Sequence, residues 1–149
     1  MHACDLMATT PAVVTPTSDL ERAAELLNDG HVGLVPVVDD LRSMHLVGVI
    51  ADRHVMTRCH AKHHSSHCTV AHHLSTDASF VVHKDDTAED VLELMDQSRM
   101  RRLPVVDEQQ RVIGVIAQAD VIRSVQASVR KAPPRATTAQ NSEMAPAFL

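Results

Sequence analysis

Apolar residues follow two spacings along the chain, and each spacing predicts a different element. Leu20, Ala23, Ala24 and Leu27 stand at i, i+3, i+4 and i+7, which is typical of an amphipathic helix with one buried face. The segments 34–38 and 44–51 are largely apolar, rich in valine and too short for globular helices, so they predict buried strands. We also expect a short helix over 2–7, a short strand over 12–15 and a helix from residue 52.

The second half of the chain repeats this order. Adding 68 to a residue number takes Pro36 to Pro104, and the helical face above to Ala88, Val91, Leu92 and Met95. Beyond the first hairpin loop, which is two residues longer, the offset falls to 66 and Gly48 matches Gly114. Each half therefore has the predicted order strand, helix, strand, strand, helix, and the chain is a tandem repeat.

A capping-box pattern precedes the first long helix of each half. Ser18 with Glu21 and Asp86 with Glu89 both place a side-chain acceptor three residues before a glutamate. Such a pair satisfies amide groups at a helix start, so we expect Ser18 and Asp86 to be the N-caps.

Length and composition fit two half-size repeats that share one core. The 149 residues, 44% of them hydrophobic, can bury one core but not two large domains. We divide the chain into a first repeat over 1–62, a histidine-rich linker over 63–68, a second repeat over 69–129 and a disordered tail over 130–149. The tail carries no periodicity and is rich in Pro, Ala and Thr.

Charge and composition argue against several classes of protein. A net charge of −5 disfavours nucleic acid as a partner, and with only two phenylalanines there is no stacking platform for bases. No apolar segment approaches the ~20 residues of a membrane span, and the amino terminus lacks a signal-peptide pattern. Three cysteines at wide spacing do not suggest a disulfide framework. We expect a cytoplasmic protein with reduced thiols and no membrane association.

The repeat resembles the CBS domain, named after cystathionine beta-synthase. The resemblance rests on the apolar-Pro-Val-Val-Asp strands at 34–39 and 103–107, each followed by a Gly-Val-Ile strand and a helix. Two such units look like a Bateman module, similar to short bacterial proteins of the hypoxic or stress response type. The resemblance implies an α+β fold in which two repeats pack with pseudo-twofold symmetry and leave clefts between them.

In this family the clefts commonly hold adenosine-containing ligands such as AMP, ATP or S-adenosylmethionine. Carried over by the resemblance, Asp120 stands at the ribose position, and Arg101 and Arg102 stand before Leu103 and Pro104, where guanidinium groups suit phosphate. The remaining residues assigned to the ligand are Val35 and Ala117.

The first repeat departs from the family pattern. It has His54 in place of the aspartate and Gly33-Leu34 in place of the arginines, and the usual Ser/Thr is alanine in both repeats. At most one competent cleft, the one that uses Asp120, is therefore expected, with weaker affinity than the family pattern would give. Local structure alone could also explain the charged residues of the second repeat. A carboxylate such as that of Asp120 is favourable near a helix amino terminus, and arginines such as Arg101 and Arg102 commonly protect a strand edge.

The linker region concentrates histidines. His60, His64, His67 and Cys68 have spacings that a helix would gather on one side, and zinc prefers such nitrogen and sulfur ligands. Ser65-Ser66 interrupts the pattern, so a solvated linker without a specific metal is the alternative.

The four glycines form no phosphate-binding or dinucleotide motif, and we expect no enzyme. The leading hypothesis is a regulatory module that binds an adenosyl ligand between the repeats and changes the surface offered to an unknown downstream protein. The alternatives are a zinc-binding stress protein and a ligand-free structural dimer. The resemblance implies a homodimer formed through the repeat helices, and Leu26, Leu94 and Ile122 make their apolar faces wide enough for it.

Overall fold

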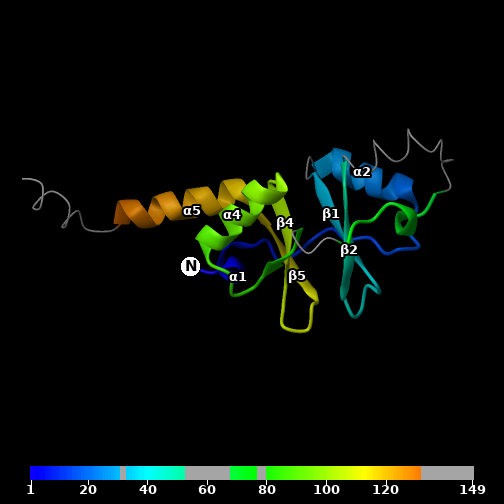
Figure 1. The fold of residues 1–149 in the computed structure, drawn as a ribbon, viewed down its shortest axis with the longest axis horizontal. Coiled ribbons are helices and arrows are strands. Elements are labelled where there is room, and N and C mark those ends of the chain that lie inside the picture. Colours follow the sequence, from blue (N-terminus) through cyan, green and yellow to red (C-terminus); the bar gives the residue numbers. More distant parts are fainter. Residues whose placement is uncertain (31–32, 53–67, 77–79, 132–149) are drawn as a thin grey trace, which may run out of the picture.

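The computed structural model describes residues 1–30, 33–52, 68–76 and 80–131, which form two similar halves side by side (Figure 1). The first half contains α2 (Leu20–Gly30) and an antiparallel pair of strands, β1 (Leu34–Val38) and β2 (Leu46–Ala51). The second contains β3 (Val82–His83), α4 (Ala88–Ser98), β4 (Arg102–Val106), β5 (Val112–Ala117) and α5 (Gln118–Lys131). Two short helical turns, α1 (Ala3–Leu6) and η1 (Val70–His72), complete the described elements.

The two hairpins confirm the predicted strands and the duplication. Pro36 pairs with Val49 in the first hairpin, and Pro104 pairs with Val115 in the second. The register shifts at the same place in both, after Val37 and after Val105. All five residues of β1 are buried, as expected of a strand covered on both faces.

The strand expected over 12–15 is shorter than predicted. Only Val14 forms a bridge, parallel to Val37, with backbone hydrogen bonds of 3.1 Å to Pro36 and 2.8 Å from Val38. Its counterpart in the second half is β3, which pairs in parallel with β4. The helix expected from residue 52 lies, apart from Asp52 itself, outside the described residues, and so do most of the linker and all but the first two residues of the expected tail.

The predicted N-cap of α4 is one residue too early. Thr87 caps α4: its hydroxyl accepts the Asp90 N–H at 3.2 Å, and Asp90 accepts the Thr87 N–H at 3.3 Å. Asp86 instead accepts the N–H of His83 at 2.9 Å. The predicted capping box, Asp86 with Glu89, and the observed one, Thr87 with Asp90, overlap in the sequence. Because the Asp86 side chain bonds within the turn before the helix, Thr87 is the cap.

Ser18 makes the same contact in the first half. Its hydroxyl accepts the N–H of Thr15 at 3.0 Å, and α2 begins at Leu20, later than predicted. The matching bonds of Ser18 and Asp86 preserve the offset of 68. The turn is thus duplicated although its side chains differ.

The segment that leads into each repeat packs on the opposite half. Ala8 forms a two-way backbone bridge to Val115 at 2.8 and 3.0 Å, and Ser75 forms the equivalent bridge to Val49 at 2.7 and 2.8 Å. The repeats are contiguous in sequence, but in space the first residues of the chain belong to the second half and residues 68–76 to the first.

The hairpin ends join the two halves symmetrically. Leu46 N–H donates to Gln110 O at 2.9 Å, and Val112 N–H donates to Met44 O at 2.8 Å. Met44 and Gln110, related by the offset of 66, both adopt positive φ, 60° and 63°. This reciprocal pairing is what a pseudo-twofold axis between the hairpins requires.

The buried residues form a core that crosses between the halves. Val35, Val37 and Leu27 pack in the first half, on the face of the sheet that α2 covers. Leu34 and Val49 cluster instead with the core of the second half. Most of the predicted helical faces are confirmed as buried, namely Leu20, Ala23, Leu27, Ala88, Val91 and Met95. Ala24 and Leu92, at the edges of those faces, are only partly buried. Among the described helices, none combines the length and apolar character needed to cross a membrane.

Candidate ligand-binding cleft

A cleft of about 390 Å³ opens between the two halves. Three parts of the chain form its walls: the start of β1 with α2, the β4–β5 hairpin with the start of α5, and the segment after α1. The residues are Ala8, Thr10, Pro11, Ala12, Leu26, Leu34, Val35, Pro36, Arg102, Val115, Ala117 and Asp120. A concave site of this size, mostly apolar with a few polar groups, is typical of small-molecule binding.

The charged groups of the cleft, Arg102 and Asp120, come from the second half. Arg102 opens β4 and pairs across the hairpin with Ala117, the last residue of β5. The helix α5 follows directly, and Gln118 N–H donates to Arg101 O at 2.8 Å, which fixes the helix start against the strand. Asp120 therefore lies in the first turn of α5, near the strand end that carries Arg102.

The apolar wall comes from the first half. Leu34, Val35 and Pro36 are consecutive residues of β1, and Leu26 of α2 lies beside them. Leu34 occupies the place that Arg102 holds in the second repeat, so the first half offers aliphatic surface where the second offers a cation. A cleft with one apolar and one charged wall suits an amphiphilic ligand.

The third wall was missed by sequence reasoning. Ala8, Thr10, Pro11 and Ala12 line the cleft because the Ala8–Val115 bridge holds their segment against β5. A Cβ atom at Gly114 would lie 2.6 Å from the Ala8 carbonyl oxygen, so only glycine permits this approach. Gly114 was the available signal, but nothing in the sequence names its distant partner.

Four of the seven predicted ligand residues lie together. Asp120, Arg102, Val35 and Ala117 line the same cleft. Arg101 is exposed beside it, and Leu103 is fully buried in the core. Pro104 is buried within β4 and is not among the lining residues.

Asp120 has a charged neighbour of its own. Arg123 Nη1 donates to Asp120 Oδ1 at 3.0 Å, three residues further along α5. The two side chains are 75% and 49% exposed, respectively, so the pair sits at the surface beside the cleft. The carboxylate is thus held by one neighbour while it remains open to solvent.

The predicted zinc ligands fall largely outside the described residues. His60, His64 and His67 belong to that part, and their arrangement stays a prediction. Cys68 is described and is buried, 8% exposed, among apolar residues of the first-half core. Within the described part of the chain, no three histidine, cysteine or acidic side chains gather as a metal site.

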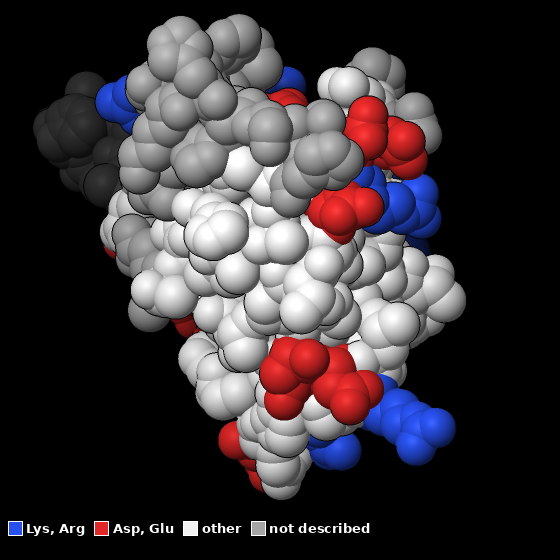
Figure 2. Space-filling view, turned by 90° about the vertical axis from the view of Figure 1, so that its right-hand side faces the viewer, with Lys and Arg blue, Asp and Glu red and all other residues white. Residues whose placement is uncertain are grey.

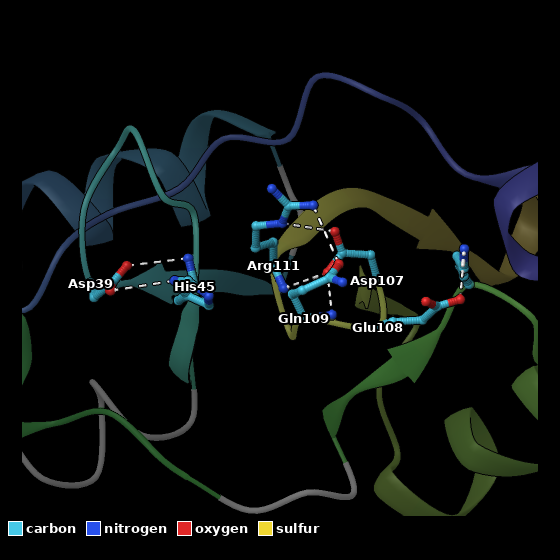
Figure 3. Close-up of polar contacts among 7 residues, drawn as sticks. Asp39, His45, Asp107, Glu108, Gln109 and Arg111 are labelled. Carbon is cyan, nitrogen blue, oxygen red and sulfur yellow. Dashed lines mark hydrogen bonds and ion pairs between the residues drawn. The ribbon is translucent and has the colours of Figure 1, made fainter.

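Further charged groups gather at the hairpin turns (Figure 3). Arg111 donates to Asp107 from its backbone N–H and from Nε, each at 2.9 Å, and these bonds lower the pKa of the Asp107 carboxyl. A hydrogen bond from Ser43 is the main cause that lowers the pKa of Asp39. The contact of Glu108 with Lys84, 3.3 Å, raises the pKa of that lysine. These charged groups form hydrogen bonds and ion pairs with one another, and the contacts stabilise the turns.

The described residues at the end face of the first half carry little charge. Figure 2 shows a broad uncharged area there, with acidic and basic side chains at its margins. The described residues on this face form no extended basic surface, in line with the net charge of −5.

Known proteins resemble this chain in sequence and in fold. The profile of the CBS domain family matches residues 3–61 and again 71–127. The CBS domain-containing protein YhcV of Bacillus subtilis is 32% identical over 117 residues, covering 78% of this chain and 80% of that protein. Hypoxic response protein 1 of Mycobacterium tuberculosis is 26% identical over 121 residues, covering 81% and 82%.

Two solved structures superpose on most of the chain. CBSX2 of Arabidopsis thaliana in complex with AMP has a TM-score of 0.71 at 27% identity, covering 87% of this chain and 98% of that one. Hypoxic Response Protein I with two coordinated zinc ions also has a TM-score of 0.71, at 23% identity, covering 83% and 98%. These matches confirm the expected fold. The chain therefore belongs to the CBS domain family, with two CBS domains paired in one polypeptide.

Proposed function

We propose that this protein is a non-catalytic regulatory module that binds an adenosyl nucleotide of the AMP type in the cleft between its repeats. The observation that carries the proposal is the meeting of Asp120 and Arg102 with the apolar wall of β1 in one cleft. The relative CBSX2, whose structure holds AMP, supports the same ligand class.

Each wall of the cleft has a role in this proposal. Arg102 meets the phosphate, because a guanidinium forms charge-assisted, two-point hydrogen bonds with phosphate oxygens. Asp120 accepts hydrogen bonds from the ribose hydroxyls. Leu34, Val35 and Val115 cover the faces of the purine with aliphatic surface. Asp120 and Arg102 lie on one half and Val35 on the other, so a ligand that touches all three responds to how the halves pack.

Regulation follows from that dependence. A ligand biases two packing states only by its difference in affinity for them. The nucleotide would favour the arrangement that brings β1 up to the start of α5. The altered surface would then be recognised by a downstream protein.

Calorimetric titration with AMP tests the binding, with thermal unfolding as a second readout. AMP at 100 times its dissociation constant should stabilise the protein by about 2.7 kcal/mol. Asp120→Asn should weaken binding about 10- to 100-fold, since a hydrogen bond to a charged group contributes ~1.5–3 kcal/mol. Asp96→Asn, at an exposed residue of α4, is the matched control and should change nothing. Equal loss in both variants, or no binding by the unaltered protein, would end the proposal.

Arg102 provides a second test, because its neighbour is a natural control. Arg102→Leu, which copies Leu34 of the first repeat, should weaken AMP binding about tenfold and leave adenosine binding unchanged. Arg101→Leu, at the exposed residue outside the cleft, should leave both unchanged. A similar loss of adenosine binding in Arg102→Leu would contradict the phosphate role.

Zinc is the second candidate ligand, favoured by the two zinc ions of Hypoxic Response Protein I and by the histidine-rich tract. Metal analysis of untagged protein after mild dialysis distinguishes the alternatives. Zinc retained at one or more ions per chain supports a site, whereas a substoichiometric amount removes it.

We also propose a homodimer that uses α5. Ile122 and Val129, seven residues apart and therefore on one face of this helix, are 41% and 69% exposed and offer apolar surface that a second chain can cover. Light scattering at micromolar concentration should give twice the chain mass. A dimer that binds neither AMP nor zinc would leave the structural role as the function.

A further inference from the structure

The carboxylate proposed for the ribose is already held by one neighbour. Asp120 Oδ1 accepts a hydrogen bond from Arg123 Nη1 at 3.0 Å, one turn along α5. An ionised carboxylate has two oxygens and about four acceptor positions, so this contact leaves Oδ2 and part of Oδ1 free to accept from a ligand. Arg123 itself is not among the cleft residues.

A second exposed pair on a helix shows what an ordinary surface contact looks like in this protein. Arg22 and Glu25 on α2 have the same i, i+3 spacing, but their closest atoms are 3.5 Å apart, and neither residue lines the cleft. The Asp120–Arg123 pair is shorter, and its carboxylate is a cleft residue. The sequence of the first repeat has His54 and Thr57 at the matching positions, so such a pair is confined to the second.

We propose that Arg123 is a positioning residue for Asp120. It restricts the carboxylate to one orientation before the ligand arrives, which lowers the entropy lost when the two ribose hydroxyls are bound. This inference rests on the proposed function and adds to it a specificity for ligands with an intact ribose diol.

The expected effect is modest, because the pair is exposed. Exposed ion pairs change affinity or stability by a factor of about two to five. Arg123→Gln should therefore weaken AMP binding by about two- to fivefold. Binding of 2′,3′-dideoxyadenosine monophosphate, which lacks both hydroxyls, should be unchanged, because Asp120 has nothing to accept from it.

The experiment is a calorimetric double-mutant cycle on the full chain with both nucleotides. The variants are Asp120→Asn, Arg123→Gln and their combination, with Arg22→Gln as the matched control for removal of an exposed, paired arginine. In the Asp120→Asn background, Arg123→Gln should have no further effect on AMP. Arg123→Lys, which keeps the charge, should recover part of the loss, and Arg22→Gln should bind like the unaltered protein.

The outcomes separate this inference from the proposed function. If the unaltered protein does not bind AMP, both fail. If AMP binding depends on Asp120 but not on Arg123, only the positioning role fails. The positioning role would also fail if Arg123→Gln lost the same affinity for the dideoxynucleotide, or lost affinity for AMP in the Asp120→Asn background. Arg123 would then act on the nucleotide directly or through its net charge.

Discussion

The two repeats share their backbone contacts and differ in the side chains that face the cleft. The turn before each long helix is closed by the same hydrogen bond, although Ser18 provides the acceptor in one repeat and Asp86 in the other. At the start of the paired strands, by contrast, Leu34 of β1 replaces the Arg102 of β4. The fold depends on interactions that several residue types can make, whereas ligand recognition depends on particular ones.

The exchanged leading segments extend this comparison to stability. Residues 1–8 lie on the second half and residues 68–76 on the first, so neither half is complete without chain from the other repeat. Two similar repeats joined in this way should unfold together. Differences in ligand chemistry need not produce a difference in stability between the halves.

The largest expected effect comes from emptying the matched core positions. Leu27 in α2 and Met95 in α4 are 2% and 1% exposed and are related by the repeat offset. Leu27→Ala and Met95→Ala should each lower the free energy of unfolding by about 2–5 kcal/mol, through lost burial and a residual cavity. Urea unfolding should show one transition in both variants.

The controls for this pair lie on the same helices. Glu25→Ala and Glu93→Ala change exposed residues at matched positions and should alter the free energy of unfolding by less than about 0.5 kcal/mol. Two separate transitions in Leu27→Ala would show that the first half unfolds alone and that the exchanged segments do not couple the repeats.

Local periodicity was enough to predict the helical faces and the buried strands. Leu20, Ala23 and Leu27 share a face because helix geometry fixes it, whatever the rest of the chain does. The resemblance to the CBS domain, and not periodicity, implied that Asp120, Arg102 and Val35 share a ligand cleft, and all three line the cleft of the structure.

Long-range contacts limited the prediction. The wall at residues 8–12 depends on a bridge between Ala8 and Val115, which are distant in sequence and carry no mutual pattern. Leu26 was assigned to an apolar face for dimerisation, but it lines the cleft. An apolar pattern on a helix predicts which residues are covered. It does not predict whether the protein core, a ligand or a partner chain covers them.

Two glycines sharpen the comparison between the halves. A Cβ at Gly48 would lie 2.6 Å from Ser75 O, and a Cβ at Gly114 would lie 2.6 Å from Ala8 O. Gly48→Ala and Gly114→Ala should each cost about 1–3 kcal/mol of stability, because backbone must move to make room. Only Gly114→Ala should also weaken AMP binding, since Ala8 is a cleft residue and Ser75 is not. Calorimetry and urea unfolding check both; equal loss of affinity would contradict the separate roles.

The smallest effect concerns the hairpin turns and their response to acid. The pKa values of Asp39 and Asp107 are both lowered in the folded protein, by Ser43 and by the backbone N–H of Arg111, respectively. The unfolded chain therefore binds more protons near its own pKa of ~3.9, and the stability that each carboxylate contributes above that pH is lost as the pH falls through the lower folded value.

Replacing each aspartate by asparagine should flatten the dependence of stability on pH between about 5 and 2. Asp39→Asn should do so by weakening the contact with Ser43, and Asp107→Asn by weakening the contacts with Arg111. Urea unfolding at pH 7, 5, 4 and 3 compares the variants with the unaltered protein. Curves that run parallel at every pH would mean that the turn carboxylates contribute nothing to acid unfolding.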